Sequence, residues 1–81
     1  MYDVVYGSRD NLGYMHAAGV EHFRTFRDAA FAVLHNVERF GEKPFELDKT
    51  EGPEVLWNSV DGWNSDALTD SEVRQLDEMT S

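Results

Sequence analysis

The strongest constraint on the fold is a set of apolar residues that recur three and four positions apart near the middle of the chain. They are Phe26, Ala29, Ala30, Val33, Leu34, Val37 and Phe40. On a helix this spacing forms one apolar stripe. Thr25 is a candidate N-cap with Asp28 three residues further on, and Gly41 is a candidate C′ residue. We therefore predict one long helix over residues 26–40.

The segments that precede this helix favour β-structure. Residues 2–6 are rich in β-forming side chains and predict a strand. Turn-forming residues at 7–13 separate it from a second expected strand over 14–23, which would complete a hairpin. The small residues at 17–19 interrupt the pattern of the second strand, and we expect a bulge or bend there.

The region after the long helix begins with a predicted loop. Residues 41–54 contain both prolines, two glycines and five acids, and predict a loop with a short extended piece at 45–47. Val55–Val60 predicts a third strand, and Asp61-Gly62 predicts the turn that ends it.

The C-terminal segment predicts a second, short helix over residues 70–79. Residues 69–72, Thr-Asp-Ser-Glu, match a capping box ahead of an apolar series. The expected order is thus ββαβα. We predict a single small acidic α+β domain over residues 1–81, with an antiparallel sheet of about three strands packed against one long helix.

Charge is distributed unevenly along the chain. Residues 1–40 carry five acids and four bases, whereas residues 41–81 carry eleven acids and three bases. The C-terminal half therefore holds about −8 of the formal net charge of −9. A concentration of one sign of charge predicts a positively charged partner.

Composition excludes several classes of protein and site. The chain contains no cysteine, which excludes disulfides and cysteine-based zinc sites and fits a cytoplasmic location. We expect neither a signal peptide nor a membrane span, because no basic segment precedes an apolar run and no apolar run approaches about 20 residues. The negative charge disfavours direct binding to nucleic acid or to anionic membranes.

No motif predicts an enzyme. Ser8, Ser59, Ser65 and Ser71 lack a nucleophile-elbow setting. His16 and His22 would lie about 20 Å apart on a strand, which is too far for one metal ion. The acids after residue 47 do not follow a calcium-loop pattern. We therefore predict no catalytic residue, no cofactor and no metal site.

Candidate partner-binding residues come from the acidic half. They are Asp61, Trp63, Asp66, Asp70, Glu72, Asp77 and Glu78. The carboxylates would attract a basic partner, and Trp63 would be an apolar anchor beside them. The alternative is a solvated acidic surface that keeps a small protein soluble, with Trp63 in the core.

The size, the acidity and the absence of cysteine resemble those of small phage-encoded inhibitors of bacterial defence systems, including anti-restriction and anti-CRISPR proteins. No motif carries this resemblance, so it assigns no residue a role. It implies a non-enzymatic inhibitor that blocks the basic groove of a nucleic-acid-handling protein, in one form by mimicking nucleic acid. The alternatives are an assembly module that pairs through a sheet edge or an apolar helix flank around Phe31, including with a copy of itself, and an immunity or antitoxin-like protein.

Overall fold

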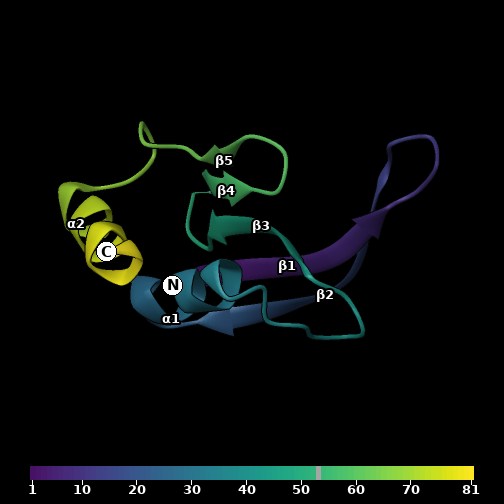
Figure 1. The fold of residues 1–81 in the computed structure, drawn as a ribbon, viewed down its shortest axis with the longest axis horizontal. Coiled ribbons are helices and arrows are strands. Elements are labelled where there is room, and N and C mark those ends of the chain that lie inside the picture. Colours follow the sequence, from purple (N-terminus) through teal and green to yellow (C-terminus); the bar gives the residue numbers. More distant parts are fainter. Residues whose placement is uncertain (53) are drawn as a thin grey trace.

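The protein forms a five-stranded antiparallel sheet with two helices (Figure 1). The computed structural model describes residues 1–52 and 54–81; Pro53, part of the predicted loop, lies outside the described residues. The elements are β1 (Tyr2–Arg9), β2 (Met15–Phe23), α1 (Phe26–Leu34), β3 (Pro44–Lys49), β4 (Val55–Asn58), β5 (Gly62–Trp63) and α2 (Asp70–Thr80). The strand order is β2-β1-β3-β4-β5. The α+β class is as predicted, but a sheet of about three strands and one long helix is wrong.

The sheet is larger than predicted because β3 and β5 were missed. β3 lies between β1 and β4, and among its residues Leu47 is the only large side chain that is fully buried. Glu46 and Asp48 point to the face of the sheet opposite Leu47. With these acids, β3 has fewer apolar residues than a typical central strand, and its sequence does not predict one. Pro44 is tolerated because it is the first residue of the strand. β5 has only two residues, too few to give a periodic signal.

Helix α1 ends at Leu34, six residues before the predicted end. Asn36 adopts a left-handed conformation with φ of 53°, which asparagine tolerates better than most residues. The N–H of Asn36 donates to the carbonyl of Val33, and the N–H of Val37 donates to that of Ala32. These two bonds form a Schellman motif, which satisfies the last carbonyls of the helix. Phe40 continues the apolar spacing beyond the end of the helix, but its ring packs edge-on against Tyr6 of β1 and does not belong to a helical stripe.

Two local predictions are confirmed. The register between β1 and β2 shifts at residues 17–19, where Tyr6 pairs with Gly19 and Gly7 pairs with Ala17. The extra residue forms the expected bulge. At the start of α2, the hydroxyl of Thr69 accepts from the N–H of Glu72, and the carboxylate of Glu72 accepts from the N–H of Thr69.

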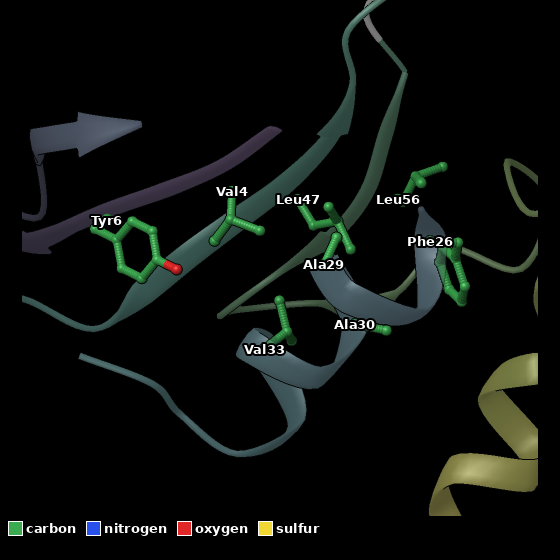
Figure 2. Close-up of a cluster of buried hydrophobic side chains, with 8 residues drawn as sticks. All are labelled: Val4, Tyr6, Phe26, Ala29, Ala30, Val33, Leu47 and Leu56. Atoms are coloured by element: carbon green, nitrogen blue, oxygen red, sulfur yellow. The ribbon is translucent and has the colours of Figure 1, made fainter. Parts of the chain in front are cut away.

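The core lies on one face of the sheet, between the strands and α1 (Figure 2). Its buried members are Val4, Tyr6, Phe26, Ala29, Ala30, Val33, Leu47 and Leu56. Trp57 and Trp63 pack against this cluster, and the Trp63 ring centroid lies 5.9 Å from that of Phe26. Apolar side chains of α2, including Leu76 and Met79, close the cluster from its end.

A buried carboxylate connects α2 to the sheet. Glu72 is 4% exposed and accepts hydrogen bonds from the hydroxyl of Tyr2 on β1 and from the N–H of Thr69. The ammonium of Lys49 on β3 lies 3.6 Å from Glu72 Oε1. Burial alone would raise the pKa of Glu72, but these hydrogen bonds and the charge of Lys49 outweigh it and hold that pKa below its ordinary value. Glu72 is therefore a structural carboxylate.

Replacing Glu72 should destabilise the protein strongly. Glu72→Ala removes the capping box and leaves the partly buried hydroxyl of Tyr2 without its acceptor, so we expect a loss of about 2–4 kcal/mol in the free energy of unfolding in urea. Glu72→Gln keeps an acceptor oxygen and should lose less. The control is Asp77→Asn, an exposed change on the same helix, with an expected effect within about 0.5 kcal/mol. Equal losses for Glu72→Ala and Asp77→Asn would contradict the structural role.

Candidate functional site: the uncovered face of the sheet

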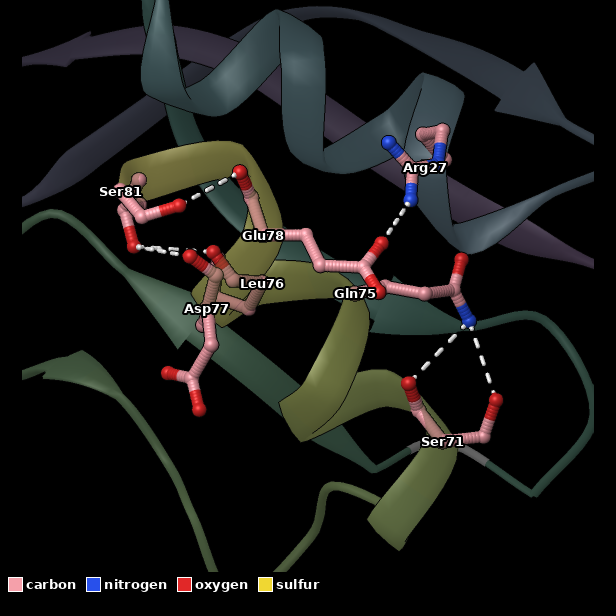
Figure 3. A network of polar contacts seen from close by, with 8 residues as sticks. Arg27, Ser71, Gln75, Leu76, Asp77, Glu78 and Ser81 are labelled. Atoms are coloured by element: carbon pink, nitrogen blue, oxygen red, sulfur yellow. Dashed lines mark hydrogen bonds and ion pairs between the residues drawn. The ribbon is translucent and has the colours of Figure 1, made fainter.

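The structure divides the predicted partner-binding residues among different surroundings. Asp70 and Asp77 are exposed on α2, one on each side of Arg74 in the helical sequence. Glu78, also on α2, accepts a hydrogen bond of 2.8 Å from the Arg27 guanidinium of α1 (Figure 3). The carboxylate of Asp77 points away from that pair in the same view. The outer surface of α2 thus mixes acids with bases and is less acidic than its sequence predicts.

Two of the predicted residues belong to the folded interior. Glu72 is buried in the connection between α2 and the sheet. Trp63 is half-buried, with its ring against Phe26 and 6.4 Å from the ring of Trp57. Of the two alternatives for Trp63, packing against the core describes its position. Glu72 therefore has no free carboxylate to offer a partner, whereas Trp63 leaves part of its side chain exposed.

The remaining two predicted acids, Asp61 and Asp66, are exposed on connecting segments. The turn between β4 and β5, which carries Asp61, lies at the far end of these strands from α2 (Figure 1). The predicted set is therefore not one contiguous acidic face. Asp61 lies beside a different group of carboxylates, on the face of the sheet opposite the core.

The alternation of side chains along the strands places this second group of acids on one face of the sheet. Val4 and Leu47 point into the core, so Asp3 of β1 and the acids Glu46 and Asp48 of β3 point to the other face. Asp3 and Asp48 are directly opposed across the two strands. Like charges in that position destabilise a sheet.

Hydrogen bonds hold Asp3 in this group. His22 of β2, its cross-strand partner on the other side, places Nδ1 2.5 Å from Asp3 Oδ1. The hydroxyl of Thr50 donates to the same oxygen over 2.9 Å. The carboxylate is thereby kept on the sheet surface beside Asp48.

Asp48 has the most perturbed carboxyl of the group. Burial raises the pKa of Asp48 to about 7, and a hydrogen bond to the Glu46 carboxyl and the negative charges of Glu46 and Asp3 act in the same direction. Within the described residues, Asp48 Oδ1 is shielded from solvent and has no hydrogen-bond partner. The surroundings of Asp48 therefore disfavour its ionised form.

The group continues to Asp61 across β4. Glu46 is opposite Asn58, whose side-chain amide donates to Asp61 Oδ2 over 3.3 Å. Glu46 and Asp61 line one hollow of about 260 Å³, together with Arg9, Met15, Phe45 and Val60. We call Asp3, Glu46, Asp48 and Asp61 the acidic strip.

Sequence reasoning placed only Asp61 of the acidic strip in a functional site. The available signal was the spacing of Glu46 and Asp48, two positions apart on either side of an apolar residue. That spacing is typical of a strand with one polar face. The prolines and glycines of residues 41–54 favour a loop with a short extended piece, and they obscure this strand signal. The opposition of Asp3 and Asp48 depends on strand order, which the sequence does not encode locally.

Across residues 1–52 and 54–81, no group of three His, Cys, Asp or Glu side chains is arranged to hold a metal ion. Nor do the helices of that part include one with the length and apolarity to cross a membrane.

Comparison with known proteins gives no relative from which to transfer a role: no family model, no curated protein and no solved structure matches the chain.

Removing the charge of Asp48 should stabilise the protein at alkaline pH. At pH 8 Asp48 is ionised opposite Asp3, so Asp48→Asn should raise the free energy of unfolding by about 0.2–1 kcal/mol. The folded-state pKa of about 7 lies above the ordinary 3.8, so the stability that protonated Asp48 contributes is full below pH 4 and is lost as pH rises to 7.

The gain from Asp48→Asn should accordingly grow between pH 5 and pH 8 in urea unfolding experiments. Asp66→Asn is the control, because Asp66 is exposed on the connection between β5 and α2. Its effect should be small and the same at both pH values. If the increase in the free energy of unfolding of Asp48→Asn does not change with pH, repulsion between the carboxylates of the strip is not its cause.

Proposed function

We propose that this protein is a non-enzymatic inhibitor that binds a basic protein through the acidic strip on the uncovered face of its sheet. The observation that supports this is the direct opposition of Asp3 and Asp48 beside Glu46. Crowded carboxylates cost stability in the free protein, and lysine or arginine side chains of a partner would relieve that cost. Electrostatic complementarity of this kind accelerates association and selects the partner.

The basic partner we propose is a nucleic-acid-handling protein, with the strip in the groove that otherwise binds phosphates. Along β3, Glu46 and Asp48 are two residues apart, which is about 6.6–6.8 Å at the rise of a strand. That spacing is close to the distance between successive phosphates of one nucleic-acid strand, roughly 6–7 Å along the backbone, although each phosphate advances only about 3.4 Å along the axis of a duplex. Blocking such a groove fits an anti-defence role of the anti-CRISPR or anti-restriction type. As part of this proposal we place the protein in the cytoplasm.

The test compares two variants with the same change in net charge. One neutralises the strip: Asp3→Asn, Glu46→Gln, Asp48→Asn and Asp61→Asn. The other neutralises four exposed acids elsewhere: Glu51→Gln, Glu54→Gln, Asp70→Asn and Asp77→Asn. Both change the formal charge from −9 to −5. Each is coupled to a resin, exposed at low salt to lysate of bacteria, the host cells of a phage-encoded inhibitor, and eluted with a salt gradient.

We expect the wild type and the second variant to retain a basic nucleic-acid-binding protein that elutes as salt rises, while the strip variant loses it. Added DNA should displace the retained protein from the wild-type resin. Screening shortens the reach of charge to about 10 Å at 0.1 M salt, so retention should fall within the physiological range. Equal losses in both variants would show that net charge alone attracts the partner, and would refute the strip as a site.

The assembly module is the alternative, and the length of the edge strand β2 favours it. β2 has nine residues without lysine or proline, two of the residue types that protect sheet edges from pairing. Phe31 adds an exposed ring on α1, stacked on His35 with 4.1 Å between ring centroids. Pairing of two copies would strengthen with salt, because both carry −9, whereas binding to a basic partner would weaken.

A further inference from the structure

The hairpin of β1 and β2 projects beyond the rest of the molecule and ends in a tightly bonded turn (Figure 1). The N–H of Asp10 donates to the carbonyl of Tyr14, and the N–H of Gly13 donates to the carbonyl of Asp10. The carboxylate of Asp10 also accepts from the N–H groups of Leu12 and Tyr14, over 2.9 and 3.0 Å. Gly13 has a φ of 87°, a conformation that glycine adopts without strain.

A further contact connects this turn to the strand that follows. His16 Nε2 on β2 lies 2.7 Å from Asp10 Oδ2. The hydrogen bonds from His16 and from the N–H of Tyr14 lower the pKa of Asp10. One ionised carboxylate therefore holds the turn at three points, and the turn is ordered before any partner arrives.

This ordered turn presents two apolar side chains to solvent. Leu12 is 82% exposed and Tyr14 is 67% exposed, the highest values among the large hydrophobic residues of the described chain. A single exposed apolar residue needs no explanation, but two on one rigid tip contribute nothing to the core. Tyrosine on a rigid support is a frequent anchor in protein interfaces, because little side-chain entropy is lost when it binds.

The tip differs in charge from the rest of the molecule. Residues 8–16 carry one base and one acid, in a chain with a net charge of −9. The tip can therefore enter an apolar pocket without bringing an uncompensated charge into it. The same net charge argues against an anionic lipid surface as its binding partner.

The tip is connected to the acidic strip along one face of the protein. Arg9 and Met15, at the base of the turn, line the hollow that also contains Glu46 and Asp61 of the strip. Arg9 is six positions along β1 from Asp3 at the other end of the strip, about 20 Å at the rise of a strand. A single partner can cover both regions.

We propose that Leu12 and Tyr14 are an apolar anchor that inserts into an apolar pocket of the basic protein bound by the acidic strip. This inference rests on the proposed function and adds a division of roles. The strip accelerates association and makes it sensitive to salt. The anchor slows dissociation and is insensitive to salt.

The experiment is site-specific photo-crosslinking with the full chain. Benzoylphenylalanine replaces Leu12 in one protein and Phe31 in the control, since Phe31 is also apolar and exposed but lies on α1. Each is irradiated in host lysate, in the native background and in the background with the neutralised strip. Mass spectrometry identifies the crosslinked protein and the residues it contributes.

We expect a single crosslinked protein from position 12 and none from position 31. That protein should be the one retained by the acidic strip, the crosslink should lie among its apolar residues, and the yield should fall when the strip is neutralised. Leu12→Ser and Tyr14→Ser should then each raise the dissociation rate by about 10- to 100-fold and leave the association rate unchanged.

Other outcomes separate the two proposals. If the strip retains a partner but position 12 does not crosslink to it, or crosslinks no better than position 31, the anchor is wrong and the proposed function stands. A position-12 crosslink to an apolar pocket whose yield is the same with the strip neutralised refutes the proposed function instead. If the strip retains no partner and position 12 forms no crosslink, both proposals are refuted. Leu12-dependent binding to vesicles of phosphatidylcholine and phosphatidylglycerol would overturn the choice of a protein pocket.

Two substitutions at Asp10 test whether the order of the turn matters. Asp10→Ala removes the acceptor shared by the N–H groups of Leu12 and Tyr14 while both anchor side chains remain. It should raise the dissociation constant about 10-fold with little change in thermal stability, because the tip lies outside the core. Asp10→Asn keeps one acceptor oxygen and should restore most of the affinity. No loss of affinity in Asp10→Ala would overturn the role assigned to the ordered turn.

Discussion

The rest of the structure depends on one constraint: the two helices cover only one face of the five-stranded sheet. Helix α1 has nine residues and packs against the face that carries Val4 and Leu47, while α2 closes the end of that same core. The other face of the sheet is left open to solvent, where polar side chains are favoured, although Val5 and its partner Val20 also lie on it. Strand alternation places Asp3, Glu46 and Asp48 on that face. The acidic strip is thus a consequence of how the core is built, although its crowding exceeds what solvation requires.

The acids of this chain serve two distinct physical purposes. Glu72 is enclosed by hydrogen bonds and a nearby ammonium, which favour its charged form and hold its pKa low. Asp48 is partly removed from solvent, but its neighbours are carboxyls, and its pKa rises to about 7. Both residues come from the acidic half of the sequence, and the sequence treats them alike. Their opposite environments explain why the pKa of Glu72 is lowered and that of Asp48 is raised, and why only the charged form of Glu72 is stabilised by the fold.

Signals confined to a few neighbouring residues were sufficient to predict several elements. The capping box at Thr69 predicted α2, and the small residues at 17–19 predicted the bulge in β2, because each feature is determined locally. The stop of α1 at Asn36 was also local, but the apolar spacing continued to Phe40 and obscured it. Tertiary packing of Phe40 against Tyr6 explains that continued spacing.

Features that depend on contacts between distant parts of the chain could not be predicted from these local signals. β3 is defined by its two neighbours in the sheet more than by its composition, and β5 consists of two residues. Of the residues predicted to bind a partner, Asp61 alone lies in the acidic strip. Adjacent acids in sequence, such as Asp77 and Glu78, were grouped by proximity along the chain, whereas Asp3 and Asp48 meet only through the pairing of β1 with β3.

The two kinds of surface in the proposed interface, the acidic strip and the apolar anchor, have complementary physical limits. Charge acts over about 10 Å at 0.1 M salt, but exposed ion pairs add little to the lifetime of a complex. Apolar anchors act only at contact, yet once desolvated they dominate dissociation. A chain of 81 residues has little area for a large apolar interface. An ordered tip with Leu12 and Tyr14, next to the hollow that holds Glu46 and Asp61, would allow a small protein with the proposed function to combine fast encounter with slow release.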